Sequence, residues 1–557
     1  MKNHAWWKES IVYQIYPRSF WDSNGDGIGD INGIRQKLDY LAELGVTVLW
    51  LCPFYKSPNV DNGYDVSDYD SVQDDFGTLA DVEALIAEAH KRNLKIMIDI
   101  VVNHTSSEHA WFIESCKGTS NEYSDFYIWR DAREGKEPNN WGSVFSGSAW
   151  TYCASRNQYY LHCFAPEQPD LNWRNAKVRA AVYDMMKKWC ERGVDGFRLD
   201  AIDLIGKTET LPDAPLADGE RFGNLWRVAI NKADVHAYLH EMHEQVFSKY
   251  DVITVAETSG ASTEDALQYA GFETGEVNMI FQFELVHASS ENGSKWSLRK
   301  ASLPQIKTIL SKWQKNLEGK AWNSLYWENH DQVRCVSKYG NDKMYWKESA
   351  KMLAVCLYFQ QGTPYVYQGQ ELGMTNSYFA NPADLRDVES INFYHEQVGM
   401  HKKDASEVMS VINNVCRDNA RTPFHWSAAA NAGFTIGTPW IAINQNYEKI
   451  NAEAQRADED SILNFYKKIF ALRKKHSVIV YGTYELLLPE HGKLYIYTRE
   501  LDGVKLLIVC NFTDEHTTFD VPKEFINARI LISNYQKETL ADGTVMPYEG
   551  SVYSVVY

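Results

Sequence analysis

Eight short apolar runs, separated by segments with helical periodicity, constrain the fold of this chain more than any other feature. Amphipathic segments such as 31–45 and 78–93 lie between the runs, and their apolar side chains recur at helical spacing. Apolar strands that alternate with helices predict a parallel sheet buried on both faces, and eight such units predict a closed (β/α)8 TIM barrel of the α/β class. The runs occupy residues 10–17, 46–51, 94–102, 194–200, 252–257, 277–283, 323–331 and 363–371.

Two parts of the chain depart from this alternation. Residues 105–174 are rich in Ser, Asn, Trp and Tyr and show little helical period, so we expect an inserted subdomain after the third strand. From about residue 480 the pattern changes to alternating strands, which predicts a separate antiparallel β domain. We therefore assign 1–104 and 175–479 to the barrel, 105–174 to the inserted subdomain and 480–557 to the C-terminal β domain.

The charge balance restricts the class of partner. Lys and Arg number 56 against 74 Asp and Glu, which gives a net charge of −18. Phosphate backbones and anionic membranes need a basic surface, so we expect no nucleic acid and no membrane partner, and a small sugar substrate is compatible. We also expect no organic cofactor and a monomer or weak homo-oligomer.

Cysteine usage and the N-terminal segment bear on location. The nine cysteines are odd in number and lack metal-type spacing, which indicates reduced thiols. The first ten residues contain no apolar core of a signal peptide, and no run approaches about 18 consecutive apolar residues. We therefore expect a cytoplasmic protein.

Ionisable residues gather where the predicted strands end. In a parallel barrel all of these ends lie on one face, where active sites of this fold occur, so Asp200, Glu257 and Asp331 should converge there. Glycoside hydrolysis requires two carboxyls, one as nucleophile or base and one as acid, and a third can position sugar hydroxyls. A single loop carboxylate is usually only a solvated group, so the prediction depends on the three together.

Four segments resemble the signature regions of the α-amylase family, glycoside hydrolase family 13: DIVVNHTS (99–106), GFRLDAID (196–203), VAETSG (255–260) and WENHDQVR (327–334). QPDLNW (168–173) resembles the additional region of the oligo-1,6-glucosidase and α-glucosidase branch. The resemblance extends from YQIYPRSF to the terminal β domain. It implies a TIM barrel and hydrolysis of α-glucosides with retained anomeric configuration.

The resemblance implies a role for each carboxyl. Asp200 resembles the nucleophile, which forms a β-glucosyl-enzyme, and Glu257 the acid/base, which is protonated first and ionised later. Asp331 resembles the transition-state stabiliser that binds the sugar 2- and 3-hydroxyls. Arg198, two residues before the nucleophile, faces the same way along the strand and should help to keep Asp200 ionised.

Further matches outline a pocket for the terminal sugar. The resemblance implies that Asp61 and Tyr64 contact the 4-hydroxyl and the ring face, and that His104 and His330 donate to the 6- and 2/3-hydroxyls. It also implies that Phe145 and Phe164, with Gln168 beside them, form hydrophobic walls, and that Arg417 is the arginine that closes the pocket. Arg421 is a poorer candidate for the closing arginine. A closed pocket implies exo action at a non-reducing end.

Residues around the leaving sugar bear on specificity. Ala201 follows the nucleophile, where relatives that prefer α-1,6 bonds tend to carry Val and those that prefer α-1,4 bonds Ala or Thr. Such a small change alters discrimination by about 1–3 kcal/mol, so Ala201 favours α-1,4 or mixed linkage without deciding it. Asp203 and Glu328 should add negative charge near the leaving sugar, and Glu389 should contact it. These acids disfavour a phosphorylated substrate.

The segment DSNGDGIGD (22–30) offers oxygen atoms at alternating positions, as hard cations prefer. It resembles the divalent-ion loop of this branch, which implies a structural Ca²⁺, with Mg²⁺ as the alternative. An exposed Asp/Gly turn is the other interpretation. The candidate ligands are Asp22, Asn24, Asp26, Ile28 through its carbonyl, and Asp30.

The leading hypothesis is a retaining exo-acting α-glucosidase that releases glucose from short α-1,4 or α-1,6 glucosides. The same residues could support sucrose isomerisation, transglucosylation or trehalose-6-phosphate hydrolysis. Sucrose isomerases of this branch carry an Arg-rich loop that does not follow WENHDQVR in this chain. A catalytically inactive transporter heavy chain would need a membrane-spanning helix near the N-terminus, which the sequence does not show, and it would usually lack an intact catalytic set.

Overall fold

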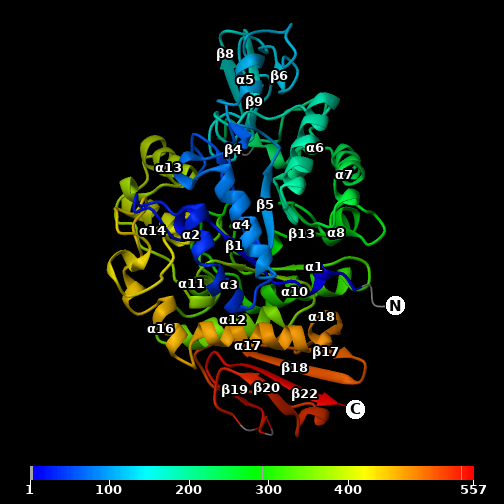
Figure 1. Ribbon diagram of the computed structural model, residues 1–557, viewed down its shortest axis with the longest axis vertical. Helices are drawn as coiled ribbons and strands as arrows, with labels where there is room; N and C mark the ends of the chain where they lie inside the picture. The colour runs from blue at the N-terminus through cyan, green and yellow to red at the C-terminus, as the bar shows by residue number, and fades with distance from the viewer. Residues whose placement is uncertain (1–3, 217–218, 292, 538, 541, 557) are drawn as a thin grey trace.

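The computed structural model describes residues 4–216, 219–291, 293–537, 539–540 and 542–556. The chain forms a central barrel, a subdomain above it that contains α5, β6, β8 and β9, and a β-sheet below it at the C-terminal end (Figure 1). The subdomain and this sheet lie at opposite ends of the molecule. The barrel face beneath the subdomain is therefore the one that loops of the insertion can cover.

The barrel consists of eight strands, each within one of the predicted apolar runs. They are β1 (Val12–Ile15), β2 (Val48–Leu51), β5 (Lys95–Val101), β10 (Gly196–Asp200), β12 (Ile253–Glu257), β13 (Met279–Phe281), β14 (Ser324–Leu325) and β15 (Thr363–Tyr367). Neighbouring strands pair in parallel in the order β13-β12-β10-β5-β2-β1-β15-β14. A parallel bridge between Ile280 and Asn323 joins the two ends of this order. The predicted TIM barrel is confirmed.

Side chains on the inner face of the strands fill the barrel. Trp50, Met97, Val255, Phe281 and Tyr365 come from five different strands and belong to one buried cluster. This interior is a packed core, as is usual for the fold. The site must therefore lie at the ends of the strands.

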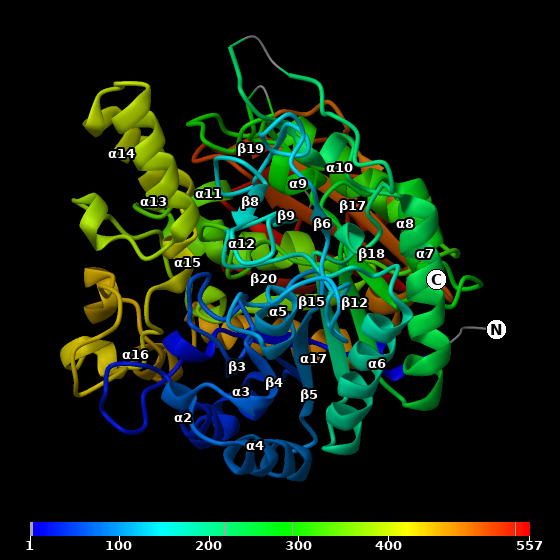
Figure 2. The same ribbon diagram turned by 90° about the horizontal axis from the view of Figure 1, so that it is seen from above.

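Helices surround the strands when the barrel is viewed from above (Figure 2). The segment 78–93 forms α4 (Leu79–Lys91), which begins with a capping box between Thr78 and Asp81. The other long helices around the barrel and beside the C-terminal sheet are α6 (Ala176–Glu191), α7 (Lys232–Gln245), α8 (Thr263–Ala270), α10 (Leu303–Leu317), α12 (Trp346–Tyr358) and α17 (Ile462–Lys475).

The segment 31–45, predicted as one helix, forms two: α2 (Ile31–Gln36) and α3 (Leu38–Leu44). Lys37 leaves helical geometry, and its amide donates to the carbonyls of Ile34 and Arg35. Its ammonium lies 3.9 Å from the ring centroid of Trp21, so a tertiary cation–π contact accompanies the break. Periodicity cannot reveal such a contact.

The insertion contains α5 (Ala110–Ser115) and an antiparallel sheet of β6 (Trp129–Arg130), β9 (Gln158–Leu161) and β8 (Trp150–Cys153). A further strand, β7 (Trp141–Gly142), pairs in parallel with β11 (Gly223–Asn224). The residues around β11 follow β10 in the chain, so the loop after the fourth barrel strand packs against the insertion. No pattern in the sequence indicates this pairing.

The C-terminal sheet is antiparallel, in the order β16-β17-β18-β22-β20, as predicted. Its strands are β16 (Thr483–Leu487), β17 (Leu494–Leu501), β18 (Val504–Asn511), β20 (Arg529–Ser533) and β22 (Gly550–Val556). β18 and β22 contact α12, which fastens the sheet to the barrel. Residue 557, the last of the predicted β domain 480–557, lies outside the described residues.

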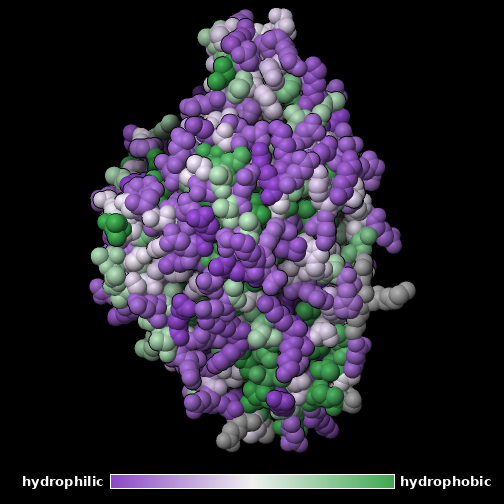
Figure 3. Space-filling view, viewed as in Figure 1, coloured by the Kyte–Doolittle hydropathy of each residue, from purple (hydrophilic) through white to green (hydrophobic). Residues whose placement is uncertain are grey.

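The face shown in Figure 3 is mostly hydrophilic. Within the described part of the chain, no helix is both long and apolar enough to cross a bilayer. All nine cysteines are free thiols, in agreement with the prediction from their spacing.

Candidate active site

A cavity of about 920 Å³ opens at the carboxyl ends of the barrel strands, a size typical of small-ligand sites. Most of the predicted site residues line it: Asp61, Tyr64, His104, Phe145, Phe164, Asp200, Ala201, Glu257, Asp331, Glu389 and Arg417. Three others, Gln168, Arg198 and His330, are buried directly behind the lining. The structure thus brings together residues that are more than 350 positions apart.

The carboxyls at the ends of β10 and β12 share one guanidinium. Arg198 Nη1 lies 2.6 Å from Asp200 Oδ1, and Arg198 Nη2 lies 2.7 Å from Glu257 Oε2. Strand register places Arg198 opposite Asp99, whose Oδ1 is 2.5 Å from the same Nη1. Arg198 is 1% exposed, so water does not weaken these contacts. The arrangement holds Asp200 and Glu257 side by side at the floor of the cavity.

Three carboxyls and one cation leave this cluster short of positive charge. Burial raises the pKa of Asp200 well above its ordinary value; Arg198 opposes this rise, whereas Glu257 and Asp99 add to it. Arg198 therefore favours the ionised form, as expected, but does not outweigh burial. A reaction that needs one protonated and one ionised carboxyl is compatible with two neighbouring acids, of which one has a raised pKa.

Asp331 lies in the opposite electrostatic environment. His330 Nε2 is 2.8 Å from its Oδ2, and Arg421 Nη2 and Arg417 Nη1 are 2.9 and 3.3 Å from its Oδ1. Burial alone would raise the pKa of Asp331, but His330, Arg417 and Arg421 outweigh it and hold that pKa well below its ordinary value. Asp331 is therefore ionised, and Arg421 helps to position it from behind the cavity.

One end of the cavity is closed by an ion pair and an aromatic ring. Arg417 Nη2 is 3.1 Å from Asp61 Oδ1, and the guanidinium lies 5.1 Å from the ring centroid of Phe145. Asn392 donates to the carbonyl of Phe145 at 2.9 Å, and this contact ties the insertion to α13 (Val388–Tyr394). The closed end can hold the last residue of a chain but offers no continuation for it.

Beside the closed end, Gln168 Nε2 donates to Asp61 Oδ2 at 3.3 Å and to the carbonyl of Tyr64 at 3.1 Å. The Tyr64 ring stacks on His330 at 5.1 Å, and its hydroxyl donates to Asp99 at 3.0 Å. Burial lowers the pKa of His104, so this ring is neutral at pH 7. His330 faces Asp331 and Tyr64, so direct donation from His330 to a sugar stays a prediction.

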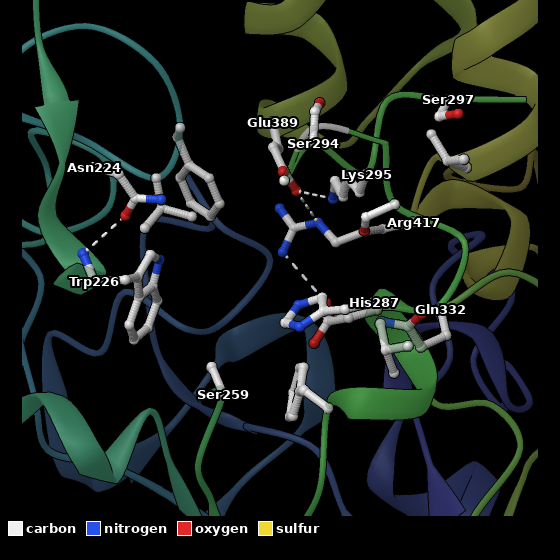
Figure 4. Close-up of a pocket in the computed structure, with 18 of the residues that line it drawn as sticks. Asn224, Trp226, Ser259, His287, Ser294, Lys295, Ser297, Gln332, Glu389 and Arg417 are labelled. Carbon is white, nitrogen blue, oxygen red and sulfur yellow. Dashed lines mark hydrogen bonds and ion pairs between the residues drawn. The ribbon is translucent and has the colours of Figure 1, made fainter. Parts of the chain in front are cut away.

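The other end of the cavity is wide and mixed in charge. Asn224 and Trp226 lie on one side, and Glu389 and Lys295 face them from the other (Figure 4). Lys295 Nζ is 2.5 Å from Glu389 Oε2, so the charge of Glu389 is neutralised. The lining also contains Arg299, Lys300 and Lys338.

Two acids expected near the leaving sugar lie elsewhere. Glu328 is fully buried, and its Oε1 is 3.0 Å from Arg334 Nη1. Asp203 is also buried and accepts a hydrogen bond from the amide of Ser259. Neither side chain lines the cavity, and Arg334 pairs with the charge of Glu328, so the expected contribution of Glu328 near the leaving sugar was wrong. The argument that acids disfavour a phosphorylated substrate therefore fails.

Sequence reasoning missed two buried acids that hold the site together. Asp99 binds Arg198 and accepts from Trp50 and Tyr64, although in the sequence it stands out only as the first residue of DIVVNHTS. Asp387, at the start of α13, lies 2.6 Å from Arg417. The acid-rich segment 384–389 was the available signal for Asp387, but Glu389 alone was selected from it.

The predicted metal loop is turned in on itself. Asp22, Asn24 and Asp26 each accept backbone amides from within the loop, and Asp30 accepts the amides of Ser23 and Gly33. The candidate metal ligands in the loop are all oxygen atoms, which Ca²⁺ and Mg²⁺ prefer. However, no group of three or more acidic, His or Cys side chains among the described residues is arranged to hold a metal ion.

The comparisons with known proteins agree with this geometry. The family described as "Alpha amylase, catalytic domain" matches residues 14–482. The chain therefore belongs to the α-amylase family, glycoside hydrolase family 13, and is a glycoside hydrolase. The oligo-1,6-glucosidase of Parageobacillus thermoglucosidasius is 52% identical over 556 residues, which is 99% of each chain.

Two solved structures are also similar. The trehalose-6-phosphate hydrolase of Bacillus licheniformis has a TM-score of 0.92 at 47% identity and covers both chains fully. The isomaltulose synthase of Klebsiella sp. LX3 has a TM-score of 0.95 at 41% identity and covers 99% of this chain and 100% of its own. The same architecture therefore serves several reactions on glucosides.

Proposed function

We propose that this protein is a retaining, exo-acting α-glucosidase that releases glucose from the non-reducing end of short α-glucosides. The observation that carries the proposal is the cavity closed by Asp61, Arg417 and Phe145, with Asp200, Glu257 and Asp331 in its lining. Such a cavity admits one terminal sugar and leaves the aglycone, the rest of the substrate, in the wide end. Full-length similarity to an oligo-1,6-glucosidase supports the same activity.

The geometry supports a two-step displacement. Asp200 attacks the anomeric carbon while Glu257 protonates the leaving oxygen, and the ionised Asp331 binds the ring hydroxyls as positive charge develops on the sugar. Glu257, now ionised, then activates water to cleave the β-glucosyl ester on Asp200. Their shared contact with Arg198 holds both groups in place for the two steps.

Initial rates on isomaltose, maltose and sucrose, measured side by side, test the proposed substrate class. We expect hydrolysis of isomaltose and, because Ala201 leaves room beside the nucleophile, of maltose as well. Transglucosylation would appear as longer products at high sugar concentration. No release of glucose from any α-glucoside would overturn the proposal, and conversion of sucrose to an isomer would favour an isomerase.

The residue after the nucleophile provides a test of linkage preference. Ala201 lies in the left-handed region at φ 40°, where a β-branched side chain is strained. A201V should lower the maltose-to-isomaltose ratio of kcat/KM by about 5- to 150-fold, corresponding to about 1–3 kcal/mol. A201G relieves the backbone strain without adding bulk and is the matched control. An unchanged ratio in A201V would show that residue 201 does not decide linkage.

A second candidate function is hydrolysis of a phosphorylated disaccharide. The basic residues Arg299, Lys300 and Lys338 in the cavity lining favour it, as does the similarity to a trehalose-6-phosphate hydrolase. Parallel assays of trehalose 6-phosphate and isomaltose decide between the two. Preference for the phosphorylated sugar would replace the leading proposal.

We further propose that the loop 22–30 binds Ca²⁺, or Mg²⁺, as a structural ion. A cation that binds only the folded protein raises its stability by about 2.7 kcal/mol at 100 times the dissociation constant. Millimolar Ca²⁺ should therefore raise the Tm of the chelator-treated enzyme, and D26A should lose most of this response. An identical Tm with Ca²⁺, Mg²⁺ and chelator would contradict the proposal.

We propose a cytoplasmic location, supported by nine free cysteines, since reducing compartments preserve thiols. We also propose a monomer or weak homo-oligomer, which size-exclusion chromatography with light scattering tests. A stable higher oligomer would contradict it.

A further inference from the structure

A turn of the insertion, residues 143–147, lines the cavity and carries Phe145, which closes one end. The base of this turn is tied within the insertion, because Ser143 Oγ donates to the carbonyl of Phe164 at 2.7 Å and accepts from the amide of Phe145 at 3.0 Å. The amide of Ser143 also donates to the carbonyl of Gly147 at 3.0 Å. The position of the Phe145 ring therefore depends on how the turn is held.

The tip of the turn is strained and loosely packed. Ser146 has a φ of 77°, in the left-handed region that a serine seldom adopts. A Cβ at Gly147 would find no described atom within 4 Å outside its own chain neighbours. Packing therefore does little to fix the tip, and polar contacts from the turn itself or from other parts of the chain must maintain its conformation.

Two polar contacts reach the turn from one helical segment. Asn392 in α13 donates to the carbonyl of Phe145 at 2.9 Å. Ser146 Oγ donates to Glu396 Oε2, also at 2.9 Å, and the carboxylate acceptor makes this bond charge-assisted. Glu396 lines the cavity from the π-helix η8 (His395–Met400), which continues α13 directly. Helices of this kind are rare and frequently occur at functional sites.

The same helical segment holds the other side chain that closes the cavity. Asp387 caps the start of α13 and lies 2.6 Å from Arg417 Nη2. The segment 387–396 therefore contacts both Arg417 and the turn that carries Phe145. The Arg417 guanidinium in turn lies 5.1 Å from the centroid of the Phe145 ring. A shift of the turn relative to this segment would separate the two groups that close the end of the cavity.

We propose that Asn392 and Glu396 are positioning residues for the closed end of the cavity: they hold the turn 143–147, and with it the Phe145 ring, against Arg417. This inference rests on the proposed function, which places a terminal glucose at this end. The two residues act through Phe145 and not on the reacting carboxyls. They should therefore determine how tightly the terminal sugar binds and leave the rate of bond cleavage nearly unchanged.

Four variants separate the hydrogen bond at the tip from the charge of Glu396. S146A removes the donor, E396A removes the acceptor, S146A/E396A removes both, and E396Q keeps an acceptor oxygen without the charge. N392A tests the second contact. H401Q is the matched control, because His401 Nε2 lies 3.8 Å from Glu396 Oε1 but His401 does not line the cavity. The measurements are kcat and KM on isomaltose and the inhibition constant of glucose, with Tm recorded for each variant.

We expect S146A, E396A and N392A each to raise KM and the inhibition constant of glucose by about 3- to 10-fold, with kcat within about twofold of wild type. The double variant should lose no more affinity than either single variant, because all three lack the same bond. E396Q should retain most of the affinity for glucose, and H401Q should match wild type.

Folded S146A and E396A with the KM and glucose affinity of wild type would overturn this inference and leave the proposed function intact. Additive losses in the double variant, or a fall in kcat without a change in glucose affinity, would overturn it as well. A wild type inactive on every α-glucoside would overturn both the inference and the proposed function.

Discussion

The variant D200N should lose at least about 10⁴-fold in kcat on isomaltose and keep its fold. The amide has the size of the carboxylate but cannot form the glucosyl ester. Because burial already raises the pKa of Asp200, removing its charge relieves a crowded cluster. We therefore expect a Tm equal to or above that of wild type, a pattern typical of active-site residues that are costly for stability.

Rescue by an external nucleophile separates a chemical role from a structural one. In D200G the space beside Arg198 can admit azide, which should attack an activated aryl α-glucoside and give the β-glucosyl azide. In the presence of azide, neither the wild type nor a folded E257Q variant should form the β-glucosyl azide. D200N with more than about a tenth of wild-type kcat would refute the assignment of Asp200 as nucleophile.

The variant E257Q should show a loss that depends on the leaving group. On isomaltose, whose leaving alcohol needs a proton, kcat/KM should fall by about 10²–10⁴-fold. On an aryl α-glucoside with an acidic phenol the first step should be nearly unaffected. The second step still lacks its base, so a burst of phenol should precede slow turnover.

The two substrates serve as controls for each other, because a misfolded site would fail on both. Equal losses on isomaltose and on the aryl glucoside, without a burst, would contradict the role of Glu257 as acid/base. Tm should stay close to wild type, since a glutamine can still accept from the Ala201 amide.

The barrel and its three carboxyls could be predicted because both depend on local pattern. Strands such as β2 (VLWL) are continuous apolar runs, and in a parallel barrel the residues that end the strands must share a face. The prediction that Asp200, Glu257 and Asp331 lie together therefore required no knowledge of loop conformation.

The rest of the site depends on contacts that periodicity does not encode. The pairing of β7 with β11 brings Trp226 to the cavity, yet these residues are more than 70 positions from their partners. Glu328 is an error of the other kind, because the sequence placed it near the leaving sugar. It lies beside Asn329 in the chain, but its side chain points to Arg334. Side-chain direction in short strands and turns decides which acids meet a sugar, and a sequence motif alone does not supply it.

Proton NMR of isomaltotriose hydrolysis tests the central claim most directly, because it reports both the site of cleavage and the anomer released. The account predicts that glucose and isomaltose appear together at the outset and that the new glucose is first the α anomer. β-Glucose as the first anomer would contradict retention, and an initial excess of the α anomer on isomaltose, with glucose released already at anomeric equilibrium, would contradict exo action at the non-reducing end.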